Sequence, residues 1–211
     1  SATAEIAKIV LLDAAKIQEE DAAYKKKRHK KEGREGPYGD QPLYTTGDAE
    51  KVFPLFVPVE YGDAVKIAPG LEAVFSEAGH VLGSSFINVG FSQNGEARNV
   101  LFSGDVGRKN RPIIRDPDGA TDGDYILVES TYGDRVHSGR EDIKAAIGEV
   151  ICQTRDAGGN LIVPSFALER AQELLYFIHE LQHENAIPHM MVFLDSPMAS
   201  AITRVFRHHP N

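Results

Sequence analysis

Cysteine is almost absent from this sequence, and other features are missing as well. The single cysteine, Cys152, excludes an internal disulfide framework and fits a reducing compartment. No apolar run is long enough to cross a bilayer, and the first residues lack the pattern of a signal peptide. These absences predict a soluble, cytoplasmic protein without a membrane partner.

Positive charge is also scarce. The chain has 23 Lys and Arg against 31 Asp and Glu, for a formal net charge of −8, so its overall charge gives no argument for nucleic-acid binding, although a local basic patch could still bind phosphate. The most basic run, "KKKRHKK" at residues 25–31, lies at the end of a predicted helix, where positive charge suits the helix dipole. We interpret it as a solvated helix end rather than a nucleic-acid contact.

What the sequence does contain is a regular alternation of apolar patterns. Helical spacing predicts helices over 3–32, from a cap at Thr46 to about Phe56, over 139–157 and 167–184, and in "MASAITRVF". Strand-like runs cover 72–77, 85–91, 98–103 and 125–130, with Asn94-Gly95 as a hairpin turn. After residue 135, "GGNLIVPS" and "MMVFLDSP" read as buried strands between helices. This predicts an α/β fold with a parallel sheet in the second part and a domain change near residue 133.

Residues that could bind a metal stand at or just after the ends of three predicted strands. His80 stands in "SEAGHVLGSS", Asp105 in "FSGDVGR" and Glu129 in "LVESTYGD". Imidazole nitrogen and carboxylate oxygen are ordinary ligands for zinc and similar cations. Each residue also has a structural alternative: a hydrogen-bonded histidine, a turn-forming aspartate and a helix-capping glutamate. Their recurrence at successive strand ends makes a metal site a reasonable hypothesis.

The second part offers a different kind of site. Ser165 in "IVPSFALERAQELL" and Ser196 in "FLDSPMASAI" each stand between an apolar run and a helix, and Arg170 could add positive charge. Free N–H groups and the helix dipole make such helix N-termini suitable for anions. The alternative is that both serines only cap their helices. Phosphate binding by Ser165, Arg170 and Ser196 therefore stays open.

The motifs, in this order, resemble the β-CASP nucleases of the metallo-β-lactamase fold. The resemblance rests on "EAGHVLGSS", "FSGDVGR", "VESTYGDR", "VPSFALERAQELL" and "LDSPMA", and covers nearly the whole chain. It implies part of a metallo-β-lactamase αββα sandwich at residues 1–132, followed by the N-terminal part of a parallel-sheet β-CASP domain at 133–211. The implied activity is that of a zinc-dependent phosphodiesterase, of ribonuclease or exonuclease type, acting on RNA in its processing or degradation.

The resemblance also implies roles for single residues. His80 would be a ligand to one of two zinc ions, and Asp105 would bridge both. Glu129 would be the acidic residue that orients a histidine near the leaving group. Ser165, Arg170 and Ser196 would belong to the inserted domain that clamps the nucleic acid.

The sequence also departs from the family pattern. It contains no His-x-His-x-Asp-His motif, and His208 and His209 lack the context of the family's late histidines. We therefore expect an internal piece of a longer enzyme that binds metal weakly or not at all and is inactive alone. Alternatives are a non-catalytic subunit that binds RNA or a partner, or a hydrolase of small esters or thioesters, which the region after residue 135 disfavours. Single-stranded DNA as a substrate, endo- or exonucleolytic cleavage, and homo-oligomerisation stay open.

Overall fold

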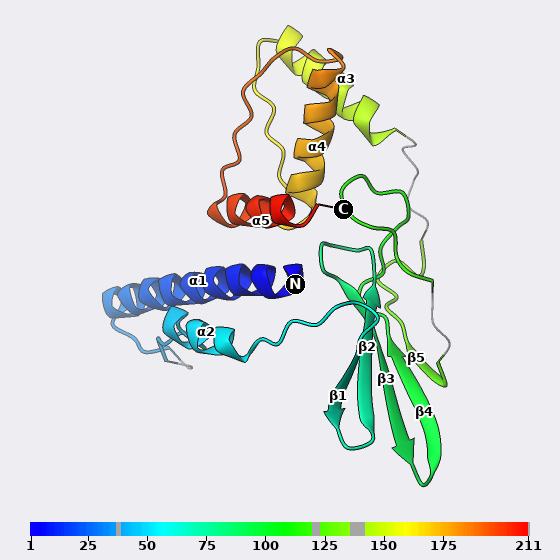
Figure 1. Ribbon diagram of the computed structural model, residues 1–211. Helices are drawn as coiled ribbons and strands as arrows, with labels where there is room; N and C mark the ends of the chain where they lie inside the picture. The colour runs from blue at the N-terminus through cyan, green and yellow to red at the C-terminus, as the bar shows by residue number, and fades with distance from the viewer. Residues whose placement is uncertain (37–38, 120–122, 136–141, 211) are drawn as a thin grey trace. The chain divides into compact units, whose positions relative to one another are not determined.

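A computed structural model describes residues 1–36, 39–119, 123–135 and 142–210 of the chain (Figure 1). It divides into two compact units, Ser1–Pro58 and Val59–Asn211. None of the helices within the described ranges combines the length and the hydropathy that a membrane crossing requires.

The first unit is built on one long helix. Helix α1 covers Ala2–Glu32, as predicted, and ends at Gly33, whose φ of 64° is the left-handed conformation common after a helix. In the basic run at 25–31, all residues except His29 are exposed, which agrees with a solvated helix end. The His29 ring is instead buried, with Nδ1 2.7 Å from Oδ1 of Asp40.

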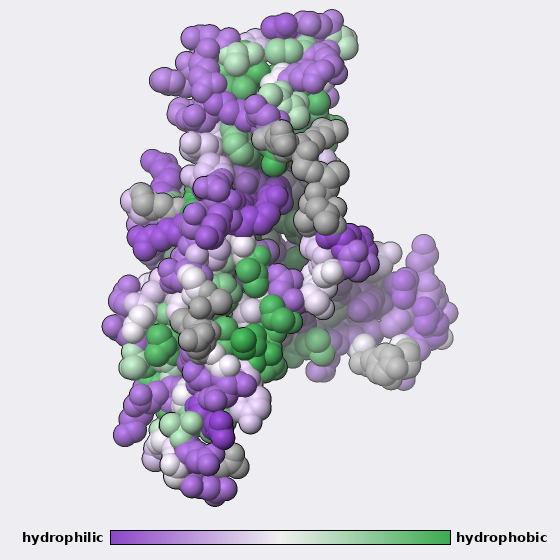
Figure 2. Space-filling view, turned by 90° about the vertical axis from the view of Figure 1, so that its right-hand side faces the viewer, coloured by the Kyte–Doolittle hydropathy of each residue, from purple (hydrophilic) through white to green (hydrophobic). Residues whose placement is uncertain are grey.

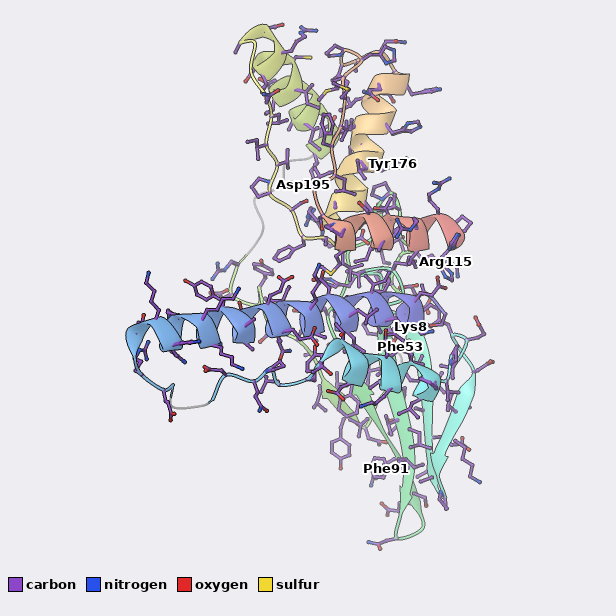
Figure 3. The ribbon with its side chains drawn as sticks, turned by 90° about the vertical axis from the view of Figure 1, so that its left-hand side faces the viewer. Lys8, Phe53, Phe91, Arg115, Tyr176 and Asp195 are labelled. Atoms are coloured by element: carbon purple, nitrogen blue, oxygen red, sulfur yellow. The ribbon has the colours of Figure 1, made fainter. Side chains whose placement is uncertain are left out.

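A short helix packs against α1 within this unit. Helix α2 covers Thr46–Val52 and continues into the 3-10 helix η1 at Phe53–Leu55. Its cap is Thr45, one residue before the predicted Thr46, because Thr45 and Asp48 form a reciprocal capping box. The ammonium group of Lys8 on α1 lies 5.8 Å from the centroid of the Phe53 ring (Figure 3).

The second unit contains a five-stranded sheet in sequential order. The strands are β1 (Ala64–Ala68), β2 (Leu71–Glu77), β3 (Ser85–Gln93), β4 (Glu96–Phe102) and β5 (Tyr125–Leu127). All neighbours are antiparallel except β4 and β5, which are parallel. The sequence patterns missed β1 and predicted a longer β5. The hairpin turn is confirmed, because Asn94 and Gly95 have φ values of 55° and 81° between β3 and β4.

Three helices follow the sheet in this unit. They are α3 (Ile143–Asp156), α4 (Arg170–His183) and α5 (Pro197–His208). The start of the helix predicted at 139 lies outside the described residues. Ile151 on α3 and Leu181 on α4 form a small core with Ile187, and Cys152 packs against it.

The parallel sheet predicted for the second part is not present among the residues that the structure describes. Residues 160–165 and 190–195 run without regular secondary structure, and no strand in the described ranges lies beside them. Ile162 is 85% exposed and Phe193 is 80% exposed. A strand is stable only when a neighbour pairs its backbone groups, so an apolar run alone does not form one. The fold is therefore mixed α/β with one mixed sheet.

The β5 edge of this sheet is apolar and exposed. Tyr125, Ile126 and Leu127 each keep more than half of their surface accessible. Figure 2 faces the side on which β5 lies in Figure 1 and shows hydrophobic residues gathered there. A short edge strand with an unpaired side is a place where further chain can pair.

Candidate metal centre

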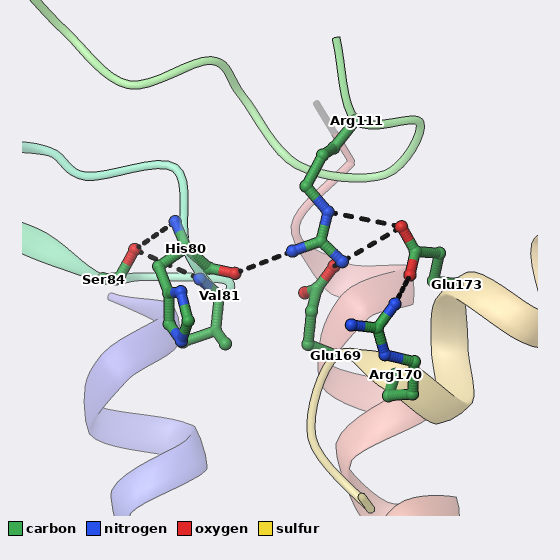
Figure 4. Close-up of polar contacts among 7 residues, drawn as sticks. All are labelled: His80, Val81, Ser84, Arg111, Glu169, Arg170 and Glu173. Carbon is green, nitrogen blue, oxygen red and sulfur yellow. Dashed lines mark hydrogen bonds and ion pairs between the residues drawn. The ribbon is translucent and has the colours of Figure 1, made fainter. Parts of the chain in front are cut away.

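The turn that carries His80 connects β2 to β3 and is closed by Ser84. The Ser84 hydroxyl accepts hydrogen bonds from the backbone N–H groups of His80 (3.0 Å) and Val81 (3.2 Å) (Figure 4). The Ser84 carbonyl accepts from the N–H of Ala78 at 3.2 Å and from the Tyr61 hydroxyl at 2.9 Å. These bonds hold the backbone at His80 in one arrangement, so its imidazole starts from a fixed point.

A buried carboxylate lies beneath this turn. Glu77 accepts a hydrogen bond from the N–H of Gly79 at 2.9 Å, and burial raises the pKa of its carboxyl. Asp118 exchanges two bonds with Glu77: its N–H donates to the Glu77 carbonyl and its side chain accepts from the Glu77 N–H, both at 2.9 Å. Asp118 therefore fastens the end of the 103–118 loop to the end of β2.

The same loop passes very close to the His80 turn at its other end. The N–H of Gly107 donates to the Ala78 carbonyl at 2.8 Å. A Cβ at position 107 would lie 1.7 Å from the carbonyl oxygen of Gly79, so only glycine permits this approach. As a result Asp105, two residues before Gly107, is brought to the His80 turn.

The predicted convergence of His80 and Asp105 is present in the geometry. Nε2 of His80 lies 3.9 Å from Oδ2 of Asp105, although the residues are twenty-five positions apart in the chain. Their side chains are 42% and 69% exposed, so both are open to solvent and to a ligand.

Glu129 lies beside this pair and supports the loop that carries Asp105. Its Oε1 accepts a hydrogen bond from the N–H of Val106 at 2.9 Å, and its own N–H donates to the Ser103 hydroxyl at 3.1 Å. The bond from Val106 is the main cause of a lowered pKa of the Glu129 carboxyl, and bonds from Thr131 and the charge of His80 lower it further. Glu129 therefore stays ionised next to the candidate site.

These residues are of the types that bind metal ions. Zinc sites in proteins use three or four protein ligands. Within residues 1–36, 39–119, 123–135 and 142–210, no group of three or more His, Cys, Asp or Glu is arranged to hold a metal ion. The imidazole and carboxylate of His80 and Asp105 suit zinc chemically, but a pair does not form a closed site.

The three candidate phosphate-binding residues have different structural roles. Ser196 caps α5, because its hydroxyl accepts from the N–H of Ala199 at 3.1 Å and Pro197 follows at the first helical position. Ser165 caps no helix, since α4 begins only at Arg170 with Glu169 as its N-cap. The Arg170 guanidinium is paired with Glu173 at 2.6 Å.

The sequence patterns missed a buried charged cluster next to the candidate centre (Figure 4). Arg111 contacts three partners: the His80 carbonyl at 3.2 Å, Glu173 Oε1 at 3.0 and 3.2 Å, and Glu169 Oε1 at 3.4 Å. The Arg111 side chain is 11% exposed and the two glutamates are 5% exposed. The only signal in the sequence is two glutamates four residues apart at a helix start, "LERAQELL", which is also ordinary surface patterning.

Glu169 occupies an unusual backbone conformation. Its φ of 70° and ψ of −58°, with the N–H of Arg170 donating to the Leu168 carbonyl at 2.9 Å, form a tight three-residue turn that is rare for residues other than glycine. Such a conformation costs on the order of 1–3 kcal/mol and persists only where surrounding contacts fix it. Burial raises the pKa of the Glu169 carboxyl to about 7, against the opposing effect of the Arg111 charge.

Comparisons with known proteins give a family match. Residues 171–211 match the model of the Beta-Casp domain. Over 167 residues the chain is 34% identical to Ribonuclease TTHA0252 of Thermus thermophilus, covering 79% of this chain and 37% of that protein. It is 30% identical to Transcription termination factor FttA of Methanocaldococcus jannaschii and 29% identical to Endoribonuclease YSH1 of Eremothecium gossypii, covering 25% and 23% of those proteins and 79% and 83% of this chain. The chain thus spans well under half the length of these relatives.

Proposed function

Because the chain belongs to the β-CASP family, we propose that it is part of a zinc-dependent phosphodiesterase that cleaves RNA during RNA processing or degradation. The observation that carries the proposal is the approach of His80 to Asp105, 3.9 Å apart, at the ends of two strands. Two of the relatives are named as a ribonuclease and an endoribonuclease, which supports RNA as the substrate.

The proposal assigns residues 1–132 to a metallo-β-lactamase portion and 133–211 to the N-terminal part of a β-CASP domain. The Beta-Casp match at 171–211 supports the second assignment. The alternation of α3, α4 and α5 with the apolar segments 160–165 and 190–195 supports it as well, provided that further strands pair with these segments. Ser165, Arg170 and Ser196 are then candidates for contacts to the RNA backbone.

In this function His80 and Asp105 would each supply a metal ligand. A bound zinc pair would lower the pKa of coordinated water and stabilise charge on the scissile phosphate. The chain's own residues prepare the site: Ser84 orients the His80 backbone, and Glu129 holds the Val106 N–H so that Asp105 faces the imidazole. The ionised Glu129 adds a negative charge that favours a cation nearby.

We propose further that this chain alone binds zinc weakly and does not cleave RNA. The test is a calorimetric titration of the chain with Zn²⁺, compared with the variants His80→Ala and Asp105→Asn. Asp63→Asn is the matched control, because Asp63 is an exposed aspartate before β1. We expect weak binding that both site variants remove and the control retains. Two tightly held zinc ions per chain, or binding unchanged in both site variants, would overturn the proposal.

Cleavage itself is tested on the longer enzyme that we propose contains this chain. A labelled single-stranded RNA and a DNA strand of the same sequence are incubated with the enzyme and with its Asp105→Ala variant. We expect cleavage of RNA by the parent and none by the variant, with the fold retained because Asp105 is exposed. A variant that cuts at the parent rate would exclude the assigned role. A parent that binds RNA without cutting it would favour a non-catalytic subunit.

A further inference from the structure

We propose that Arg111 is a positioning residue that locks the His80 turn onto the first turn of α4. The inference rests on the proposed function in one respect: it takes His80 as a metal ligand. Its basis is that the planar guanidinium of Arg111 contacts the His80 turn on one side and α4 on the other. Nη1 donates to the His80 carbonyl at 3.2 Å, while Nε and Nη2 reach Oε1 of Glu173 at 3.2 and 3.0 Å (Figure 4).

The contact fixes the backbone of His80 and does not involve its ring. The N–H of His80 is held by the Ser84 hydroxyl at 3.0 Å, and its carbonyl is held by Arg111. Both backbone polar groups of this residue therefore have a side-chain partner. Neither partner occupies the imidazole, whose Nε2 lies nearest to Asp105 at 3.9 Å.

Burial makes the contact rigid. The guanidinium donors have fixed directions, and the Arg111 side chain is 11% exposed against carboxylates that are 5% exposed. Charges that are withdrawn from water in this way are costly to leave without partners, so removing a partner of Arg111 is penalised. A surface arginine with the same partners would be screened and mobile.

The backbone of Glu169 is consistent with this anchoring role. Its positive φ of 70° turns the chain so that the carboxylate lies 3.4 Å from Nη2 of Arg111 at the start of α4. The region that matches the Beta-Casp domain begins two residues later, at residue 171. Arg111 thus links the His80 turn directly to the first turn of that region.

The inference is tested on the full chain by amide hydrogen exchange and by the NMR signals of the His80 ring, with neither metal nor RNA present. The variants are Arg111→Met, Arg111→Lys and the control Arg108→Met, which removes an exposed arginine from the same loop. We expect exchange at His80 and Val81 to accelerate by roughly tenfold or more in Arg111→Met, because a hydrogen bond from a charged group is lost. Arg111→Lys should show a smaller acceleration, since lysine keeps the positive charge but lacks the planar guanidinium with its several fixed donors. Exchange in β2 and β3 should not change.

A double-variant comparison separates a specific effect of the Arg111–Glu173 contact from general destabilisation of the chain. Glu173→Gln weakens the contact between Arg111 and α4. If Arg111 holds the His80 turn through that contact, the double variant Arg111→Lys and Glu173→Gln should accelerate exchange in the turn no more than the stronger single change does. Effects that add, or exchange at His80 and Val81 that matches the parent in Arg111→Lys and Glu173→Gln, would overturn the inference. These two conservative variants decide the question should Arg111→Met fail to fold.

The outcome is distinguishable from failure of the proposed function. In the RNA-cleaving enzyme, Arg111→Lys should lower kcat with little change in KM, because the ligand geometry changes while the RNA-binding surface does not. If the Arg111 variants loosen the His80 turn but the parent enzyme does not cleave RNA, the proposed function is contradicted while the role of Arg111 stands. An unchanged turn would contradict that role even if the enzyme cleaves RNA.

Discussion

At the scale of single residues, the candidate centre depends on two loops that touch through their backbones. Gly107 donates to the Ala78 carbonyl, and the absence of a side chain at position 107 is what permits the contact. The residues with candidate chemistry, His80 and Asp105, stand on either side of this contact. A glycine that carries no chemistry therefore determines whether the two ligand-type residues meet.

We predict that Gly107→Ala destabilises the chain by about 3 kcal/mol or more and separates His80 from Asp105. The added methyl group would lie 1.7 Å from the Gly79 carbonyl oxygen, and backbone atoms cannot yield cheaply. Urea unfolding measures the loss of stability. Gly119→Ala is the matched control, since a Cβ there meets nothing within 4 Å. Equal stabilities for the two variants would contradict the close approach.

A second prediction concerns the pH dependence of stability through Glu169. Its pKa is raised from 4.5 to about 7 by burial, so the folded state holds the proton more tightly than the unfolded state. The resulting stability is present below pH 4.5 and is lost as the pH rises through 7, by up to about 3 kcal/mol. Arg111, Glu173 and Arg170 are the charged groups around it.

Urea unfolding at a series of pH values checks this directly. Relative to the parent chain, Glu169→Gln should gain stability steadily between pH 4.5 and 7, because the glutamine has no proton to lose. Glu60→Gln replaces an exposed glutamate in the same unit and serves as the control. A difference between parent and Glu169→Gln that is constant across this range would show that Glu169 does not carry the shift.

At the scale of elements, the sequence patterns succeeded where a signal is local. Helix α1 follows from an apolar stripe without proline or glycine before Gly33, and the hairpin follows from Asn94-Gly95. The positions of His80, Asp105 and Glu129 after strands were predictable for the same reason. The Arg111–Glu173 contact was not, since its partners are 62 positions apart and no short pattern reports such a pairing.

The two serines predicted at helix starts give a matched test at this scale. Ser196→Ala should cost about 1 kcal/mol of stability, because the hydroxyl accepts the Ala199 N–H at the start of α5. Ser165→Ala should change stability by less than about 0.5 kcal/mol, because Ser165 is exposed and caps no helix. Thermal unfolding followed by circular dichroism compares the two. A larger loss for Ser165→Ala would mean that α4 begins earlier than Arg170.

At the scale of the whole molecule, the apolar segments at 160–165 and 190–195 show what hydrophobic patterns in a sequence cannot predict. Their composition indicates burial, yet Ile162 and Phe193 are exposed. Hydrophobic periodicity reports that a segment tends to be buried, but the surface that covers it must come from elsewhere. For these segments no part of the chain that the structure describes provides that surface as a paired strand.

Exposed apolar segments of this kind lead to a final prediction, that the chain associates with itself as its concentration rises. Apolar surface left in water favours contacts between molecules. The free edge of β5, beside which no strand lies in the described part of the chain, adds backbone groups that can pair. Sedimentation velocity over a concentration series measures the association. The double change Ile162→Lys and Phe193→Lys should reduce the association, because contact would then remove two charged groups from water at a cost in free energy. Leu43→Lys is the control, since Leu43 is 92% exposed and belongs to the other unit of the chain. A chain that stays monomeric at every concentration, or that loses association equally with the control, would show that these segments are not the contact surface.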